Sequence, residues 1–205
     1  MGISLQQFNE MTARVRGRKT RVSAPAIATA VLTPAGAPKV ILGIDPSLRG
    51  TGYGIIEVRR AQTKALTHGT ISCPNDWPHS RCLAHIAETL RALLRKYQPA
   101  VCAVEGLFFA QNLKTAIVMG EARGAALATL GEAGVEIYEI APRKVKQAIV
   151  GYGAAQKLAV AKMVQRLLQL PELPDADAAD ALALALTQAQ FLERSRYQLS
   201  SAKPI

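Results

Sequence analysis

The sequence predicts an α/β protein in which a mixed five-stranded sheet carries helices on both faces. Two short apolar, partly β-branched runs flank a glycine-rich turn at 45–54, which is typical of a β-hairpin. Beyond a third such run, apolar segments alternate with segments of helical periodicity. The run at 100–104 is continuously apolar, as expected for a strand buried on both faces. Together these patterns favour a sheet that is covered by helices on both sides.

The first predicted strand ends on a carboxylate. Residues 40–44 are apolar, and Asp45-Pro46 ends the strand because proline cannot donate to a sheet ladder and favours a turn. Three glycines follow within 50–54, and 55–58 then returns beside the first strand. Such a turn lets backbone amides approach a phosphate, and an aspartate in it can hold a divalent cation. A plain Asp-Pro turn between two core strands is the alternative that these residues leave open.

The remaining elements follow from hydrophobic period and breaker residues. Segment 79–97, for example, has one apolar helical stripe, and Pro99 closes it. The predicted strands lie at 40–44, 55–58, 65–73, 100–104 and 135–140. The predicted helices lie at 79–97, 111–132, 143–150, 154–170 and 175–194, the last with an aspartate as its N-cap.

The predicted helix at 111–132 has a face of small residues. Their spacing of four places them on one side of the helix. They are Ala116, Gly120, Gly124 and Ala128. This flat face could pack on the protein's own sheet or on a second subunit, and the sequence leaves both open.

Composition restricts the class of protein. The 205 residues are enough for one domain plus an arm, and 49% are hydrophobic. Lys and Arg outnumber Asp and Glu by 25 to 15, and this net charge of +10 favours a polyanionic partner such as nucleic acid, although a merely soluble basic protein is the alternative. The three cysteines lack CxxC spacing and are expected to be reduced thiols of an intracellular protein. No apolar run approaches the roughly 20 residues of a membrane span, so no membrane partner is expected.

Residues 1–38 are expected to form a disordered basic arm ahead of a domain at 39–194 and a flexible tail at 195–205. The arm holds a single acidic residue, Glu10. Its basic residues are Arg14, Arg16, Arg18, Lys19 and Arg21. It has no h-region of a secretory signal, so a cytoplasmic protein is expected, with an organelle transit peptide as the alternative.

Four carboxylates occupy positions at which they could converge. Asp45 ends the first strand, Glu105 ends the fourth, and Asp177 and Asp180 lie on one face at the start of the last helix. That helix is apolar nearly all round, so it should be buried, and its aspartates then face a cleft or carry a large desolvation cost. Divalent cations would compensate converging carboxylates, and Mg²⁺ prefers such hard oxygen ligands. Helix N-terminal acidity alone would also explain the two aspartates.

From about residue 40 to 190 the chain resembles the RuvC-type Holliday-junction resolvases, which are endonucleases with the RNase H-like fold. The resemblance covers most of the chain and rests on motifs in family order and spacing. These are Ile44-Asp45-Pro46, Thr51-Gly52-Tyr53-Gly54, Glu105 with Phe108, Ala110 and Asn112, Ala122-Arg123-Gly124, Val145-Lys146-Gln147, Val150-Gly151, Lys157 and residues 176–183. The fold class that it implies is the same mixed sheet with helices on both faces.

The resemblance implies a Mg²⁺-dependent endodeoxyribonuclease that resolves four-way DNA junctions by paired symmetric nicks in recombination and repair. It implies that the acidic tetrad, Asp45, Glu105, Asp177 and Asp180, is catalytic and binds two Mg²⁺ ions per site, for which Mn²⁺ can substitute. One ion would activate the attacking water and the other would stabilise the leaving 3′ oxygen. The implied partners are four-way junction DNA, a second copy in a homodimer, and junction-binding and branch-migration proteins.

The resemblance also implies residues that bind DNA. Lys146 and Lys157 would approach the DNA, and Phe108 would contact bases near the crossover. Arg143 is a further DNA-binding candidate beside Lys146. Solvated surface lysines are the alternative for both lysines.

Three residues depart from the family pattern. Ser47 stands where the family usually has glycine, and Gly106 and Glu121 stand where it commonly has glutamine. None of them is a member of the tetrad. They leave open how the loop near the scissile phosphate and the cleavage-sequence preference carry over.

Other functions are compatible with parts of the pattern. An RNase H-like nuclease acting on RNA would share the carboxylates, because base-edge and 2′-OH contacts decide that substrate. A sugar-kinase or actin-like ATPase would share the glycine-rich hairpin, but the chain lacks a second phosphate loop. A non-catalytic junction-binding subunit is disfavoured because all four carboxylates are present.

Overall fold

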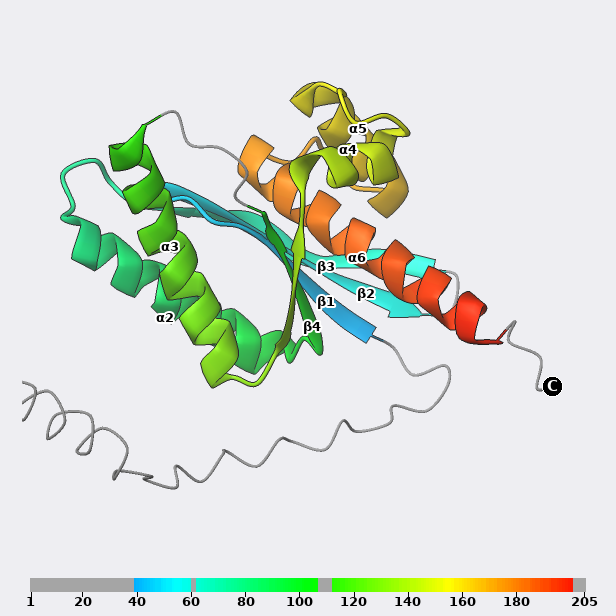
Figure 1. The fold of residues 1–205 in the computed structure, drawn as a ribbon, viewed down its shortest axis with the longest axis horizontal. Coiled ribbons are helices and arrows are strands. Elements are labelled where there is room, and N and C mark those ends of the chain that lie inside the picture. The colour runs from blue at the N-terminus through cyan, green and yellow to red at the C-terminus, as the bar shows by residue number, and fades with distance from the viewer. Residues whose placement is uncertain (1–38, 60–61, 107–111, 201–205) are drawn as a thin grey trace, which may run out of the picture. The chain divides into compact units, whose positions relative to one another are not determined.

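The computed structural model describes residues 39–59, 62–106 and 112–200, with side chains up to residue 194 (Figure 1). The predicted arm at 1–38 and Phe108 lie outside these residues. The tail predicted at 195–205 is described only to residue 200, where it continues the last helix.

Five strands form one sheet in the described residues, in the spatial order β3-β2-β1-β4-β5. The strands are β1 Lys39–Asp45, β2 Gly50–Arg59, β3 Gln62–Ser72, β4 Val101–Glu105 and β5 Glu136–Ile140. Strands β1, β2 and β3 are antiparallel neighbours, whereas β4 runs parallel to both β1 and β5. The mixed sheet is the predicted one, and β1 and β2 form the predicted hairpin.

Helices cover both faces of this sheet, as predicted. The described helices are α2 His79–Tyr97, α3 Leu113–Glu132, α4 Pro142–Val150, α5 Lys157–Leu168 and α6 Ala176–Ser200. Helices α2 and α3 lie on one face, and α4, α5 and α6 lie on the other (Figure 1). The alternation along β1 divides its side chains between two cores, because Ile41 packs beneath α6 while Leu42 and Ile44 pack beneath α2 and α3.

Helix ends differ from the predicted ones where local chemistry decides them. Helix α3 begins at Leu113 because the side chain of Asn112 accepts a hydrogen bond from the Thr115 amide at 2.9 Å. Helix α4 begins at Pro142 itself, since proline suits the first turn of a helix. Helix α5 begins at Lys157 instead of 154, and α6 continues past the predicted end at 194 to Ser200.

Helix α6 lies very close to the sheet because glycines form the surface beneath it. Gly43 and Gly54 pair with each other across β1 and β2. A Cβ at Gly43 would overlap the Ala181 carbonyl oxygen, and a Cβ at Gly54 would lie 2.7 Å from the Leu182 side chain. The helix therefore takes the space that strand side chains would fill. This close approach explains why α6 is buried almost all round from residue 178 to 189.

The small-residue face of α3 points away from its own sheet. The helix contacts the core through Ala122, Ala126 and Leu130, which are fully buried. Gly120 and Gly124 are exposed, and a Cβ on either would meet no described atom within 4 Å. Packing of this face on the protein's own sheet, one of the two predicted possibilities, is therefore wrong.

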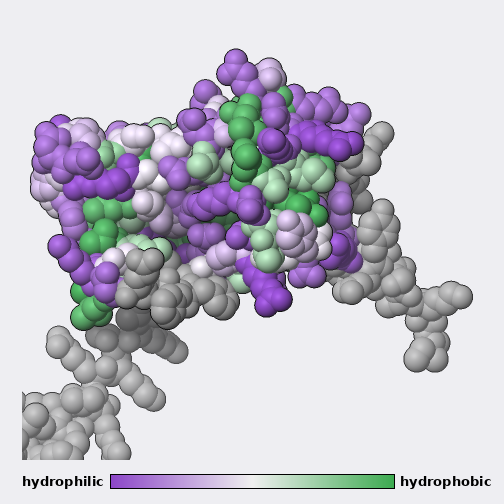
Figure 2. Space-filling view, turned by 90° about the horizontal axis from the view of Figure 1, so that it is seen from above, coloured by the Kyte–Doolittle hydropathy of each residue, from purple (hydrophilic) through white to green (hydrophobic). Residues whose placement is uncertain are grey.

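The face seen in Figure 2 is mainly hydrophilic, and its apolar residues lie in separate small patches. Of the helices in the described ranges, none has the length and apolar character needed to cross a membrane.

Candidate active site

The parallel pair β1 and β4 places two carboxylates next to each other. Ile44 pairs with Val104, so Asp45 and Glu105 follow at neighbouring strand ends. Side chains alternate between the two faces of a strand, and Ile44 and Val104 both pack beneath α2 and α3. Asp45 and Glu105 therefore lie on the α6 face, where they share a hydrogen bond.

Helix α6 brings the other two carboxylates to the same place. Gly52 pairs across the sheet with Asp45, and the Asp177 backbone lies directly on Gly52. The Asp177 carboxylate lies over the start of β2, with Oδ2 2.8 Å from the Cβ position of Gly50. Asp180, one turn further along, is close enough to Asp45 for its charge to affect that carboxyl group.

Burial and mutual repulsion disfavour the ionisation of both Asp45 and Glu105 at once. Burial raises the pKa of Glu105 to about 8, and the negative charge of Asp45 and their shared hydrogen bond contribute to this rise. Burial and the charge of Asp180 also raise the pKa of Asp45, against the opposing effects of the Glu105 hydrogen bond and the Lys157 charge. Burial and repulsion therefore favour a bound proton or cation at this pair of carboxylates.

Lys157 supplies a positive charge at the site. Its Nζ donates to Asp180 Oδ2 at 2.7 Å, and this hydrogen bond raises the pKa of Lys157. The lysine side chain is 71% exposed whereas that of Asp180 is 19% exposed, so the ammonium group reaches in from solvent. Lys157 was predicted to lie near the DNA, and the structure places it against the tetrad.

The donor chemistry of the tetrad fits a divalent cation. Four carboxylates give an all-oxygen donor set, which Mg²⁺ prefers over nitrogen or sulfur. Among the described residues, no group of three or more Asp, Glu, His or Cys side chains is already arranged to hold a metal ion. Two contacts occupy the carboxylates instead, namely the Asp45–Glu105 hydrogen bond and the Lys157–Asp180 ion pair. A cation bound between the carboxylates would compete with these two contacts.

The other predicted DNA-binding residues are not in contact with the tetrad in the described structure. Lys146 is half-buried on α4 and forms no ion pair with any described residue. Arg143, near the start of the same helix, has its side chain against the backbone of Gly153. Phe108 is outside the described residues, so its position stays a prediction.

The turn after Asp45 is held by side chains that were not predicted to have this role. Buried Thr51 donates its hydroxyl to the Ser47 carbonyl at 2.6 Å and accepts from the Ser47 amide at 3.2 Å. The Arg49 guanidinium donates to the carbonyls of Pro74 and Trp77. Although Ser47 departs from the glycine usual in the family, the turn is stabilised by these hydrogen bonds between Ser47 and Thr51. A threonine shortly after Asp-Pro was the only sequence signal for this.

Arg123 belonged to a predicted motif without a role of its own, yet it reaches the end of β4. Its guanidinium donates to the backbone carbonyl of Glu105 and to the carboxylate of Glu139 on β5. The side chain is only 12% exposed. The only sequence signal was that Arg123 belongs to the Ala122-Arg123-Gly124 motif, and this motif indicates no partner for the arginine.

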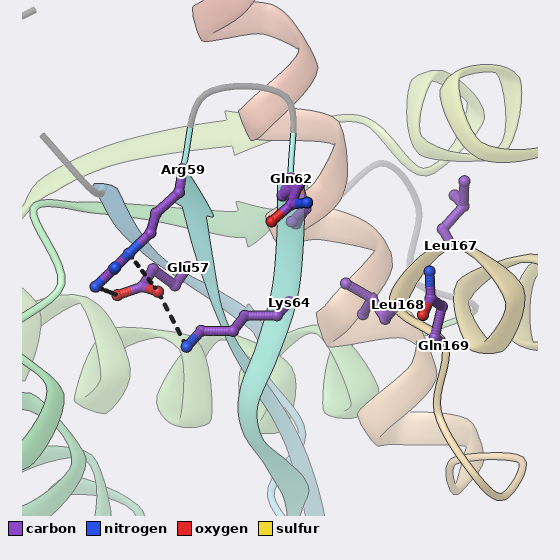
Figure 3. Close-up of a pocket in the computed structure, with 8 residues that line it drawn as sticks. Glu57, Arg59, Gln62, Lys64, Leu167, Leu168 and Gln169 are labelled. Atoms are coloured by element: carbon purple, nitrogen blue, oxygen red, sulfur yellow. Dashed lines mark hydrogen bonds and ion pairs between the residues drawn. The ribbon is translucent and has the colours of Figure 1, made fainter. Parts of the chain in front are cut away.

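A separate cavity of about 560 Å³ lies at the other end of the sheet (Figure 3). It is lined by Glu57, Arg59, Gln62, Thr63, Lys64, Leu167, Leu168 and Gln169. Glu57 Oε2 pairs with Arg59 Nε at 3.0 Å and Lys64 Nζ at 3.2 Å, so these charges are paired internally. Arg59 is the last residue of β2, whereas Asp45 pairs with Gly52 near its start. This cavity is therefore not part of the candidate active site.

Known proteins are similar to this chain in sequence and in fold. A family model described as crossover junction endodeoxyribonuclease RuvC matches residues 41–188. A protein of that description from Akkermansia muciniphila is 46% identical over 147 residues, which cover 72% of this chain and 88% of the relative. Another from Syntrophomonas wolfei is 44% identical over 163 residues, covering 79% of this chain and 95% of the relative.

Solved structures agree with the sequence matches. The structure of Thermus thermophilus RuvC in complex with Holliday junction substrate aligns with a TM-score of 0.71 at 35% identity, covering 82% of this chain and 99% of that one. The yeast mitochondrial Holliday junction resolvase aligns with a TM-score of 0.52 at 13% identity, covering 79% of this chain and 86% of that one, a likeness that shows the fold alone.

Proposed function

The chain belongs to the crossover junction endodeoxyribonuclease RuvC family, and we propose that it resolves four-way DNA junctions by paired symmetric nicks in recombination and repair. The observation that carries this proposal is the meeting of the acidic tetrad at the ends of β1 and β4 beneath the start of α6. The alignment with a junction-bound relative over 82% of the chain supports a junction as the substrate.

The reaction is hydrolysis of one phosphodiester in each of two strands. The oxygen of a water molecule bonds to phosphorus, the bond from phosphorus to the 3′ oxygen breaks, and the strand is left with a 3′ hydroxyl and a 5′ phosphate. Asp45, Glu105, Asp177 and Asp180 would hold two Mg²⁺ ions, or Mn²⁺ in their place. When bound, this metal supplies an activated water and Lewis-acid stabilisation of the charge on the leaving oxygen.

The chain's own residues supply orientation and charge. Asp45 and Glu105 are fixed to the ends of two paired strands, and rigid placement of reacting groups lowers the entropy cost of reaction. Lys157 would turn from Asp180 to the substrate phosphate and stabilise its charge, because its long side chain is mostly exposed and reaches in from solvent. The buried floor beneath the tetrad lowers the local dielectric, so each of these charges acts more strongly than in water.

A homodimer fits both the substrate and the surface of α3. A four-way junction is nearly two-fold symmetric, and two sites related by a two-fold axis would cut opposing strands. We define the α3 face as Leu113, Ile117, Gly120, Gly124 and Ala128. Leu113 is 77% exposed and Ile117 is 53% exposed, and two large apolar side chains exposed on one helix face suit a protein contact. The exposed glycines beside them would let a second copy's helix approach closely.

Further contacts with DNA and proteins complete the proposal. Phe108 would stack on a base that is unpaired at the crossover, and Lys146 and Arg143 would contact the phosphate backbone of an arm. Junction-binding and branch-migration proteins would act on the same DNA. The net charge of +10 supports association with nucleic acid, and hence a protein associated with the nucleoid in the cytoplasm.

The test is cleavage of a synthetic four-way junction beside a replication fork, a plain duplex and an RNA/DNA hybrid of the same sequence. With Mg²⁺, symmetric nicks in opposing strands of the junction are expected, and EDTA should abolish them. Preferred cleavage of the hybrid would support an RNA-directed nuclease instead. Tight junction binding without cleavage in Mg²⁺ or Mn²⁺ would indicate a non-catalytic subunit.

A further inference from the structure

Arg123 joins three elements at one point. It projects from α3, donates to the backbone carbonyl of Glu105 at the end of β4, and donates to the carboxylate of Glu139 on β5. Gly106, which follows Glu105, extends the pairing of β4 with β5, because its amide donates to the Ile140 carbonyl at 2.9 Å. The end of β4 is therefore held from α3 and from β5 together.

The guanidinium and the Glu105 carboxylate lie on opposite faces of the sheet. Val104 packs beneath α2 and α3, so the Glu105 side chain points to the α6 face. Glu139 pairs with Val104 in register and shares its face, where α3 lies. Arg123 thus binds the backbone of Glu105 from the α3 face of the sheet, whereas the carboxylate of Glu105 lies on the α6 face with the other three carboxylates.

The departure at Gly106 makes room for this arrangement. A Cβ there would lie 3.1 Å from Glu139 Oε1 and 3.3 Å from Glu139 Cγ. The Glu139 side chain therefore lies over the bare backbone of Gly106 on its way to Arg123. A residue with a Cβ at 106 would require the Glu139 side chain to shift slightly.

We propose that Arg123 is a positioning residue, which with Glu139 as its counterion fixes the strand end that carries Glu105 and so sets where that carboxylate meets the metal. This inference rests on the proposed function, since it assigns a role within the same site. Arg123 does not touch the reacting atoms. Its effect passes through one backbone carbonyl.

The chemistry of arginine suits this role. Its planar guanidinium offers several donors in a fixed fork, so one side chain can bind a carbonyl and a carboxylate at once. Lysine has the charge but not the fork. Because Arg123 is 12% exposed, its contacts are little screened by solvent, whereas Glu139 is 59% exposed and still reaches water.

A matched ion pair elsewhere on α3 provides the control. Arg91 on α2 pairs with Glu132 on α3 through Nη2 and Oε2 at 3.1 Å. Both side chains are substantially exposed, at 44% and 62%, and the hydrogen bonds of Arg91 go to Glu132 and not to β4. Arg91→Gln therefore removes an Arg–Glu contact of α3 without touching the Glu105 strand.

The experiment compares Arg123→Gln, Arg123→Lys, Glu139→Gln and Arg91→Gln with the wild-type full-length protein. Four quantities are measured for each: the single-turnover cleavage rate at saturating Mg²⁺, junction affinity in EDTA, Mn²⁺ affinity without DNA by electron paramagnetic resonance, and the melting temperature. Mn²⁺ binding without DNA reports on Glu105 independently of the nucleic-acid substrate.

Arg123→Gln is expected to slow cleavage by about tenfold or more, since small misplacements of catalytic groups have effects of this size. It should weaken Mn²⁺ binding while junction affinity stays within about twofold of wild type, because neither the DNA surface nor the net charge of the tetrad changes. Arg123→Lys should recover little of the lost cleavage rate and Mn²⁺ affinity. Glu139→Gln, which still accepts a hydrogen bond, should give values between those of Arg123→Gln and the wild type. Arg91→Gln should match wild type in rate and in Mn²⁺ affinity.

Unchanged Mn²⁺ affinity in Arg123→Gln, or an equal effect from Arg91→Gln, would overturn the inference. If Arg123→Gln does not fold, Arg123→Lys and Glu139→Gln decide, and wild-type values in both would also overturn it. Failure of the wild-type protein to cut junctions would instead contradict the proposed function, whereas the Mn²⁺ comparison would still test Arg123.

Discussion

Gly52 and Asp177 are in contact through their backbones. A Cβ at Gly52 would overlap the Asp177 carbonyl oxygen, and Gly52 is also the residue that pairs across the sheet with Asp45. Together with Gly43 and Gly54, this bare backbone position on β2 lets the helix that carries the remaining aspartates lie close to the sheet. This contact makes the glycine a determinant of the active site without any side chain of its own.

Gly52→Ala should push α6 away from the sheet. Overpacking of a tight core costs about 1–3 kcal/mol of unfolding free energy, and the shift of Asp177 should also slow junction cleavage. Denaturant unfolding and single-turnover cleavage measure the two effects. Gly131→Ala is the matched control, because a Cβ there meets no described atom within 4 Å. In a helix this change should leave cleavage intact and stabilise by up to about 1 kcal/mol.

The sequence predicted the fold because its local signals agree with one another. The apolar runs, the Asp-Pro turn and the period of the helices all indicated the mixed sheet with helices on both faces, and the structure confirms it. The same signals placed Asp45 and Glu105 at the ends of their strands, and the structure shows that these two strands are neighbours. Their roles as metal ligands stay a prediction.

Contacts that depend on tertiary packing could not be read from the sequence. Arg123 reaches Glu105 and Glu139 across three elements, and no spacing along the chain indicates this. The Lys157–Asp180 ion pair likewise joins two different helices, α5 and α6. The sequence also left the small-residue face of α3 undecided, since both sides of that helix carry small residues.

Asp45→Asn is expected to abolish cleavage while junction binding in EDTA is retained or tightened. The substitution removes a carboxylate ligand, and it also lessens the repulsion between the site and the phosphates. Asp177→Asn should behave in the same way. Asp76→Asn, a change of equal charge at an exposed loop position, is the control and should cut at the wild-type rate. Wild-type nicking by either tetrad variant in Mg²⁺ would contradict the assignment of that residue.

Ile117→Glu should convert a dimer into a monomer. Placing a charge in the middle of the α3 face would bury an unpaired carboxylate at the contact between two copies, which is strongly unfavourable. Sedimentation analysis should show the change in mass, and junctions should be nicked singly instead of in pairs. Leu173→Glu is the control, since Leu173 is 45% exposed, similar to the 53% of Ile117, but lies outside α3. A dimeric Ile117→Glu protein would show that the α3 face is not the contact.

The basic residues of the arm, which lie outside the described part of the chain, are expected to strengthen DNA binding. The test variant replaces all five of them with glutamine in the full-length protein. They are Arg14, Arg16, Arg18, Lys19 and Arg21. They follow no apolar period, so we expect them to contact phosphates without fixing sequence or register. Counterion release then contributes a log–log salt slope of roughly 0.9 per phosphate contact, or at most about 4–5 for five contacts.

The glutamine variant should therefore bind junctions more weakly at low salt, and its binding should depend less steeply on salt. The cleavage sites and the maximal rate at saturating enzyme should not change, because the tetrad lies entirely within residues 45–180. A second variant with lysine at the four arginine positions keeps every charge and should retain the wild-type slope, since counterion release depends on charge rather than on the guanidinium group. If the arm is instead a transit peptide, the mature native protein would lack it, and intact-mass measurement would show this. An unaltered slope together with lost nicking would contradict both interpretations and indicate that the arm contributes to the active site itself.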